Sequence, residues 1–326
     1  MSEDLRIAVI GAGRMGSDHI ERIHHRMERA RIAAIVDIDE TRARAAVEGI
    51  DGARVYTDFT EAIASGEVDA VLISTPGFLH EDVLLPTITQ GLPILCEKPL
   101  TPDSASAWRV VQAESAIGRK LIQVGFMRRF DAGYQRIQQA VASGERGELL
   151  ALDCEHINPG VPAGYTGSNL IDDTVVHEFD GVRFLTGEEI ASVQVRTGKN
   201  SCHVTTEGLQ DPAQILMDTG SGVRVSVNTH VTAQYGYAVT TRASFEKIHL
   251  NEGVDQVYPG FEERFVDAYD TEVQDWIDGC LRDEVAGPDA WDGYAAAACC
   301  EAGLRAVAEP GTTVAVELEQ KPELYR

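Results

Sequence analysis

The chain has 326 residues, of which 44% are hydrophobic and 25% charged, ordinary values for a soluble globular protein with room for two domains. Its net charge of −24, from 28 basic and 52 acidic residues, argues against binding to nucleic acid or to an anionic membrane. No apolar run could span a bilayer and no signal peptide precedes the first strand, so we expect a cytoplasmic protein. The six cysteines lack any zinc-binding spacing and are typical of reduced core thiols.

Short apolar runs alternate with helical stretches in the first third of the chain. The predicted strands are 5–11, 31–37, 53–58, 69–75, 92–99 and 120–126, and the predicted helices are 16–30, 39–49, 60–66, 80–91 and 104–118. Strands that alternate with helices favour right-handed crossovers. Residues 1–124 are therefore predicted to form a doubly wound parallel sheet of the Rossmann type, with helices on both faces.

The pattern changes after about Gly125. Strands are predicted at 147–157, 191–198, 214–233 and 237–250, the third of them broken by the hairpin signal "TGSG" at Thr219–Gly222. Helices are predicted at 173–187, 268–281 and 294–306. Residues 125–326 are therefore predicted to form a second α/β domain, with an open, largely antiparallel sheet and helices on one face.

A glycine-rich motif, "GAGRMG" at Gly11–Gly16, follows the first predicted strand and opens the first helix. An acid, Asp37, ends the second strand about twenty residues later, which is the context of a dinucleotide-binding fingerprint. The glycines let the backbone approach a pyrophosphate at the helix N-terminus, and Asp37 can bind ribose hydroxyls. Because Asp37 and Asp39 would repel a 2′-phosphate, NAD is favoured over NADP, although Arg42 and Arg44 follow and leave NADP open.

A lysine lies where ligands bind to such sheets. In "CEKPL", Cys96–Leu100, Lys98 follows the fifth parallel strand, and ligands bind at the carboxyl ends of these strands. A lysine there can hold a substrate hydroxyl and favour its deprotonation. A solvated surface lysine is the alternative that a lone residue leaves open.

An acidic, histidine-containing stretch, "LIDDTVVHEFD" at Leu170–Asp180, is the second candidate for chemistry. In an α-helix, Asp173, His177 and Asp180 would share a face. Periodicity alone leaves metal ligation, proton transfer and a solvated helix face open. Metal sites typically draw on further ligands from other segments, so we predict that no metal takes part.

These motifs occur together in one family. "GAGRMGSDH", "ISTP" at Ile73–Pro76, "CEKP" and "DDTVVH" resemble the glucose-fructose oxidoreductase and inositol dehydrogenase superfamily over essentially the whole chain. "GFMRRFDAGY", "HINP", "QYGYAV", "DAYDTEVQDWI" and "GPDAWDGYAAAA" look most like its inositol 2-dehydrogenase branch. The segment "TTRASFEKIHL" departs from the more usual acidic, glycine-containing continuation of that branch.

The resemblance implies a site and an assembly. It implies that His177 is the general base, that Asp173 orients its imidazole, and that Lys98 binds the reacting hydroxyl. It further implies substrate contacts from Arg128, His156, Asn158, Asp180 and Tyr235, with Tyr237 as an alternative to Tyr235. The implied cofactor contacts are Gly11, Gly13, Arg14, Met15, Gly16, Asp37, Ser74, Thr75, Pro76, His80, Glu97 and Lys98. Members of the family commonly assemble through the second sheet, so a homotetramer is expected.

The implied reaction is NAD-dependent oxidation of a secondary hydroxyl of a cyclic polyol, foremost myo-inositol to 2-keto-myo-inositol (scyllo-inosose). A related sugar dehydrogenase is the alternative, acting on a glucose-like pyranose, an anhydrosugar, a glycoside at C3, or scyllo-inositol. These rings present similar arrays of hydroxyls. A dinucleotide-sensing regulatory protein without turnover is the alternative from another class, and the presence of Lys98, Asp173 and His177 argues against it.

Overall fold

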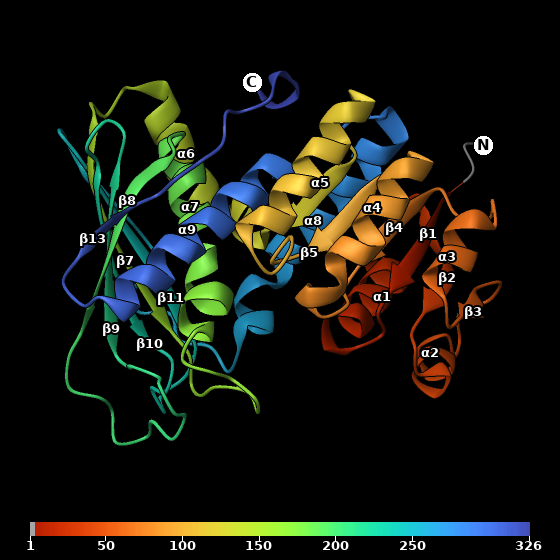
Figure 1. The fold of residues 1–326 in the computed structure, drawn as a ribbon, viewed down its shortest axis with the longest axis horizontal. Coiled ribbons are helices and arrows are strands. Elements are labelled where there is room, and N and C mark those ends of the chain that lie inside the picture. The colour runs from red at the N-terminus through yellow and green to blue at the C-terminus, as the bar shows by residue number, and fades with distance from the viewer. Residues whose placement is uncertain (1–3) are drawn as a thin grey trace. The chain divides into compact units, whose positions relative to one another are not determined.

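The structure is a computed structural model and describes residues 4–326. The chain divides into two compact units (Figure 1). Of the described residues, unit 1 contains 4–126, Tyr269–Tyr294 and Gln320–Arg326, and unit 2 contains Met127–Ala268 and Ala295–Glu319. Each unit is thus built from segments that are distant in the sequence. No helix within residues 4–326 is long and apolar enough to cross a membrane.

Unit 1 is built on a six-stranded sheet in which every neighbouring pair is parallel. Its strands are β1 (Leu5–Ile10), β2 (Ala30–Val36), β3 (Arg54–Tyr56), β4 (Ala70–Ile73), β5 (Ile94–Glu97) and β6 (Ile122–Gly125). Their order is β3-β2-β1-β4-β5-β6. This order reverses direction beside β1 and confirms the predicted doubly wound parallel sheet.

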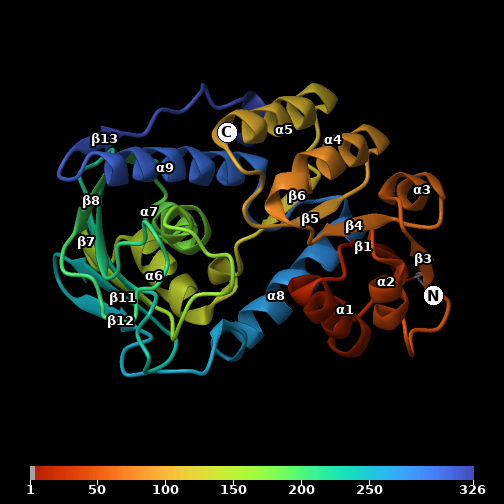
Figure 2. The same ribbon diagram turned by 60° about the horizontal axis from the view of Figure 1, so that its bottom comes forward.

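Helices cover both faces of this sheet (Figure 2). Helices α1 (Arg14–Arg26) and α2 (Glu40–Ala46) lie on one face, and α3 (Phe59–Ala64), α4 (His80–Gln90) and α5 (Ser104–Ile117) lie on the other. Helix α1 ends at Arg26, before the predicted residue 30, and β2 begins at Ala30. The second part of α8 (Phe261–Arg282) returns to unit 1, where Val273, Trp276 and Ile277 share a buried cluster with Ile20 and Ile23 of α1.

Unit 2 is built on a seven-stranded sheet of order β12-β11-β7-β10-β9-β8-β13. Its strands are β7 (Leu149–Ile157), β8 (Ile190–Thr197), β9 (Ala213–Thr219), β10 (Arg224–His230), β11 (Ala238–Phe245), β12 (His249–Glu252) and β13 (Thr313–Ala315). Only the β7–β10 pair is parallel, so the sheet is largely antiparallel, as predicted. The predicted turn at Thr219–Gly222 joins the antiparallel strands β9 and β10, and Gly222 supplies the positive φ of 90°.

Helices cover one face of the second sheet (Figure 1). They are α6 (Ala132–Ser143), α7 (Val176–Thr186) and the part of α9 (Ala290–Ala308) that belongs to unit 2, with a 3₁₀ turn, η2 (Met127–Phe130), before α6. The alternation along β7 explains this arrangement, since Leu152, Cys154 and His156 are buried while Asp153 and Glu155 are exposed. Two further 3₁₀ turns, η1 (Gly77–Leu79) and η4 (Glu323–Tyr325), lie in unit 1.

The predicted regular helix at 173–187 is wrong at its start. Leu170–Val175, labelled η3, is a π-helical segment, and α-helical geometry begins only at Val176. A π-helix bonds residue i to i+5 and so makes a wider turn than an α-helix, and such segments are frequent at functional sites. Asp173 therefore lies on a π-helical turn and His177 on the first turn of α7.

Candidate active site

The glycine motif of unit 1 forms a tight turn between β1 and α1. Gly11 has a φ of 96°, and a β-carbon there would lie 2.8 Å from the backbone of Ser74. At Gly16 a β-carbon would lie 1.9 Å from the carbonyl oxygen of Gly11, so helix α1 can start against the turn only without a side chain. A β-carbon at Gly13 would meet no atom of the chain within 4 Å. This open position, next to the N-terminus of α1, fits a cofactor's pyrophosphate.

Arg14 and Met15 form the first residues of α1, and no side chain caps that helix. Asp37 follows β2 and is buried. Its carboxylate accepts hydrogen bonds of 2.9 Å from the backbone N–H of Ala12 and from that of Asp39. These bonds hold the acid beside the glycine turn, where it can accept ribose hydroxyls. The half-exposed Arg42 donates to both oxygens of Asp37 at 3.2 Å, so its guanidinium also lies beside the glycine turn.

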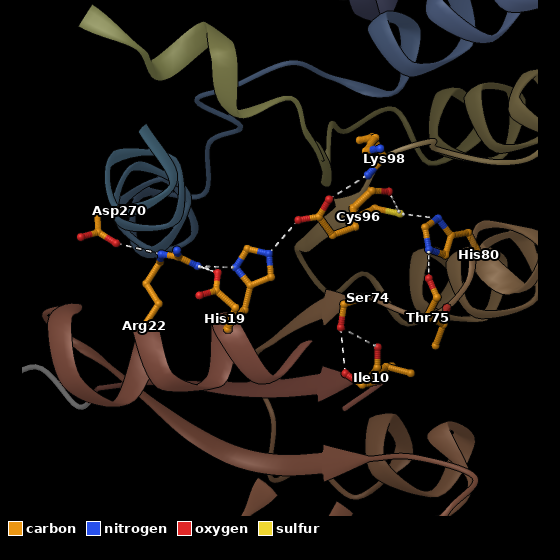
Figure 3. Close-up of polar contacts among 12 residues, drawn as sticks. Ile10, His19, Arg22, Ser74, Thr75, His80, Cys96, Lys98 and Asp270 are labelled. Carbon is orange, nitrogen blue, oxygen red and sulfur yellow. Dashed lines mark hydrogen bonds and ion pairs between the residues drawn. The ribbon is translucent and has the colours of Figure 1, made fainter. Parts of the chain in front are cut away.

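The loops after β4 and β5 are tied together (Figure 3). The hydroxyl of Ser74 donates to the carbonyl oxygens of Gly11, at 2.8 Å, and Ile10, at 3.3 Å. The ring of His80 lies 2.8 Å from the carbonyl oxygen of Thr75 through Nε2, and 2.8 Å from that of Pro99 through Nδ1. Burial lowers the pKa of His80. This histidine bridges two loops, whereas Pro76 lies exposed at the start of η1.

The end of β5 carries Glu97, and Lys98 follows it directly. The backbone N–H of Lys98 donates to Oε2 of Glu97 at 3.2 Å, and Nε2 of the buried His19 lies 2.7 Å from Oε1 (Figure 3). Lys98 therefore extends from a stretch of backbone that a buried carboxylate holds. The contact between His19 of α1 and Glu97 of β5 was not indicated by the sequence pattern.

Three charged or polar groups meet in unit 2. Arg128 of η2, 1% exposed, pairs with Glu178 of α7, 2% exposed. The Nδ1 atom of His156 lies 3.1 Å from Nη2 of Arg128 and 3.0 Å from Oε1 of Glu178. Burial alone would raise the pKa of Glu178, but the charge of Arg128 and the bond to His156 outweigh it and lower that pKa. Two of the predicted substrate residues, Arg128 and His156, are thus joined by an acid.

Glu178 was not among the predicted site residues. It lies inside the stretch that drew attention, next to His177, yet it was not assigned a role, because helical spacing selects Asp173 and Asp180. Helix α7 is buried on nearly every side, so the periodicity of its polar residues does not show which of them face a binding site. A basic partner on a distant segment, as here in η2, was the missing information.

The two tyrosines left open by the sequence have different surroundings. Tyr235 is 58% exposed, whereas Tyr237 is 4% exposed. The ring centroid of Tyr237 lies 5.8 Å from that of His156, and the ring of His177 lies 6.4 Å from that of His156. Burial raises the pKa of Tyr237 to about 12, so its hydroxyl stays protonated. Tyr237, not Tyr235, is therefore the tyrosine that the fold brings next to His156.

The other predicted substrate residues of unit 2 are fixed by nearby groups. Asp180 is buried and receives a two-pronged ion pair from Arg129, with distances of 2.6 to 3.1 Å. Asn158 follows β7, and its backbone N–H donates to the carbonyl oxygen of His230 at 3.0 Å. His177 is buried on α7, while Asp173 is partly exposed.

Among residues 4–326, no group of three or more His, Cys, Asp or Glu side chains is arranged to hold a metal ion.

Comparison with protein families agrees with this geometry. A model described as the oxidoreductase family, NAD-binding Rossmann fold, matches residues 5–126. The GFO/IDH/MocA C-terminal domain matches residues 134–251, and an oxidoreductase family C-terminal alpha/beta domain matches residues 245–316. The chain belongs to the GFO/IDH/MocA oxidoreductase family. It is therefore an oxidoreductase with an NAD-binding Rossmann domain, as the sequence resemblance implied.

Several named proteins of this family are similar along their full length. The chain is 55% identical to the inositol 2-dehydrogenase of Pseudarthrobacter chlorophenolicus and 46% identical to that of Corynebacterium glutamicum, each alignment covering 100% of both chains. A crystal structure of myo-inositol dehydrogenase from Lactobacillus casei, in complex with NAD(H) and myo-inositol, is 35% identical with a TM-score of 0.94. That match covers 99% of this chain and 100% of the other.

Proposed function

We propose that this protein oxidises a secondary hydroxyl of a cyclic polyol with NAD, and that its substrate is myo-inositol and its product 2-keto-myo-inositol. The observation that carries the proposal is the 35% identity, with a TM-score of 0.94, to a structure that holds NAD(H) and myo-inositol. The full-length identity of 55% to a protein named inositol 2-dehydrogenase supports the same substrate. The proposal also accounts for the residues that the sequence singled out.

Residues of unit 1 are proposed to hold the cofactor. The turn at Gly11, Gly13 and Gly16 and the N-terminus of α1 take the pyrophosphate, and Asp37 takes the adenosine ribose. The remaining proposed cofactor contacts are Arg14, Met15, Ser74, Thr75, Pro76, His80, Glu97 and Lys98. When bound, NAD supplies a nicotinamide ring that accepts a hydride from carbon.

Side chains of the protein are proposed to remove the proton of the substrate hydroxyl. We assign to His177 the removal of the hydroxyl proton, as the C–H bond gives up its hydride and the alcohol becomes a ketone. Asp173 orients the imidazole and stabilises its charged form, and Lys98 binds the reacting hydroxyl. The 6.4 Å between the rings of His177 and His156 supports a location of the base beside the Arg128–Glu178–His156 cluster.

Polyol recognition is proposed for residues of unit 2. Arg128, His156 and Asn158 supply donors and acceptors for ring hydroxyls, and Tyr237 is favoured over Tyr235 because it lies beside His156. Asp180 is buried and held by Arg129, which suits a role in shaping the pocket. A homotetramer and a cytoplasmic location complete the proposal, on the family resemblance and on the absence of cysteine spacings typical of secreted or zinc proteins.

A panel of substrates tests the proposed function. The purified protein is assayed with myo-inositol, scyllo-inositol, glucose, an anhydrosugar and a methyl glycoside, each with NAD and with NADP, by absorbance at 340 nm. We expect the highest kcat/KM with myo-inositol and NAD. A higher kcat/KM with a glucose-like ring would replace the proposal by the sugar dehydrogenase alternative. Binding of NAD without turnover of any compound would favour the dinucleotide-sensing alternative.

Cofactor preference is tested at Asp37. Replacing Asp37 by alanine removes the ribose acceptor, to which Arg42 now donates at 3.2 Å, and leaves Arg42 paired with Asp39 at 3.6 Å. We expect kcat/KM for NAD to fall about 10-fold or more and kcat/KM for NADP to rise, since the half-exposed guanidinium of Arg42 can then bind a 2′-phosphate. Initial rates with both cofactors measure the change, and Glu67→Ala, on a surface pair with Arg54, is the matched control. Unchanged affinity for both cofactors would contradict the assignment.

A further inference from the structure

The ring of His19 is held between two charged side chains in unit 1 (Figure 3). His19 is 1% exposed on α1, with Nε2 at 2.7 Å from Oε1 of Glu97 and Nδ1 at 3.3 Å from Nη1 of Arg22. A guanidinium can only donate, so Nδ1 must accept from Arg22, and the ring carries its proton on Nε2. The Nε2–H group therefore donates to Glu97. This arrangement selects one tautomer of a neutral imidazole.

Arg22 is itself fixed. Its guanidinium donates to Asp18 at 2.7 Å and to Asp270 at 2.8 Å, and it lies 5.1 Å from the ring centroid of Tyr269. Burial opposes the charge of Arg22, but the two carboxylates outweigh it and raise its pKa above the ordinary value. Asp270 and Tyr269 belong to α8, so the return of this helix to unit 1 provides the anchor for Arg22. These contacts hold the guanidinium of Arg22 against Nδ1 of His19.

The carboxylate of Glu97 receives donors on both oxygens, from His19 on Oε1 and from the backbone of Lys98 on Oε2. Burial would raise the pKa of Glu97, but these hydrogen bonds and the neighbouring positive charge lower it. Gly125 on the adjacent β6 leaves room for the carboxylate, because a β-carbon there would lie 3.1 Å from Oε2. Glu97 is therefore an anion held in one orientation beside Lys98.

Two other titratable groups face Glu97. The ring of His80 and the thiol of Cys96 both interact electrostatically with its charge. Burial lowers the pKa of His80 and raises that of Cys96. The groups that lower the pKa of Glu97 are His19 and Lys98.

We infer that His19 and Arg22 are positioning residues for Lys98, acting through the carboxylate of Glu97. The inference rests on the proposed function, in which Lys98 binds the reacting hydroxyl. His19 sets the orientation of Glu97, and Glu97 holds the backbone of Lys98 and places a negative charge beside it. Without the donor on Oε1, the carboxylate is free to turn or to take up a proton, and the residue that follows it loses its fixed position.

The test compares His19→Leu with His19→Gln. We expect His19→Leu to lower kcat/KM for myo-inositol about 10- to 100-fold, the scale that misplacement of a substrate-binding group produces. His19→Gln restores most of the rate, because its amide can donate to Glu97 and accept from Arg22. His24→Leu, an exposed histidine on the same helix, is the matched control.

The pH profile separates positioning from mere packing. His19 lowers the pKa of Glu97, so removing its N–H raises that pKa, and the protonated acid then persists to higher pH. The acid limb of the kcat/KM profile is therefore expected to move to higher pH in His19→Leu and to stay in place in His19→Gln. A loss of rate in both variants, with both acid limbs unmoved, would overturn the inference in favour of simple packing.

The tautomer of His19 can be measured in the wild-type protein, so this test does not depend on the folding of a variant. In protein labelled with ¹⁵N-histidine, the His19 resonances are expected to show the tautomer with Nε2–H and an unprotonated Nδ1. The Nδ1–H tautomer overturns the inference. A different result, lack of turnover by the wild-type protein, would contradict the proposed function. If the wild type turns over and His19→Leu matches it in rate and profile, only the inference is wrong.

Discussion

Replacing His177 by alanine is expected to lower kcat for myo-inositol oxidation about 10²- to 10⁴-fold, the usual contribution of a positioned general base. The imidazole is the group proposed to take the hydroxyl proton, and no neighbouring side chain is proposed to share that task. The Kd for NADH is expected to stay close to the wild-type value, because the proposed cofactor contacts belong to unit 1. Stopped-flow or steady-state assays at 340 nm measure kcat, and fluorescence titration measures the affinity.

Two further variants make this result specific. His203→Ala removes an exposed histidine of unit 2 and is expected to leave kcat unchanged. Asp173→Asn keeps the shape of the side chain but removes the charge that stabilises the imidazolium, so kcat is expected to fall strongly as well. A His177→Ala protein that oxidises myo-inositol at the wild-type rate would remove His177 from the mechanism.

Breaking the Arg128–Glu178 pair is expected to cause the largest loss of stability. Both side chains are almost completely buried, and removing one partner leaves an uncompensated charge. Glu178→Gln is therefore expected to reduce the free energy of unfolding by about 3 to 5 kcal/mol, the usual cost of such a change. Urea denaturation followed by circular dichroism measures this loss.

A double replacement tests the cause of that loss. Because two apolar side chains of similar size bury no charge, Arg128→Met combined with Glu178→Met is expected to recover much of the stability lost in Glu178→Gln. Activity is not expected to recover, since Arg128 is proposed to contact the polyol. Arg44→Gln, which removes a surface partner of Glu40, is the control and is expected to leave stability almost unchanged. Equal stability of Glu178→Gln and wild type would show that the pair is not important to the fold.

The architecture could be predicted because it depends on local patterns. Strands such as β1 and β4 are short runs of buried apolar residues, and β7 alternates buried and exposed residues along its length. The glycine motif and Asp37 have fixed spacing, since the turn demands Gly11 and Gly16 for steric reasons. The family resemblance then added the expected roles of Lys98, Asp173 and His177.

What could not be predicted depends on contacts between distant segments. Glu178 is 50 residues from its partner Arg128, and Arg22 is 248 residues from Asp270. The return of α8 to unit 1 has no local signal, because its amphipathic pattern is the same whichever core it enters. The π-helical start of the predicted helix at 170–175 likewise has no pattern of its own.

Transfer of hydrogen from the substrate to NAD tests the central claim most directly. The protein is incubated with NAD and myo-inositol that carries deuterium on C2, and the reduced cofactor and the product are analysed by mass spectrometry. We predict one deuterium in NADH for each 2-keto-myo-inositol formed, together with a slower rate than with unlabelled substrate. Reduced cofactor without deuterium, or no reduction of NAD in the presence of myo-inositol, would contradict the proposed reaction.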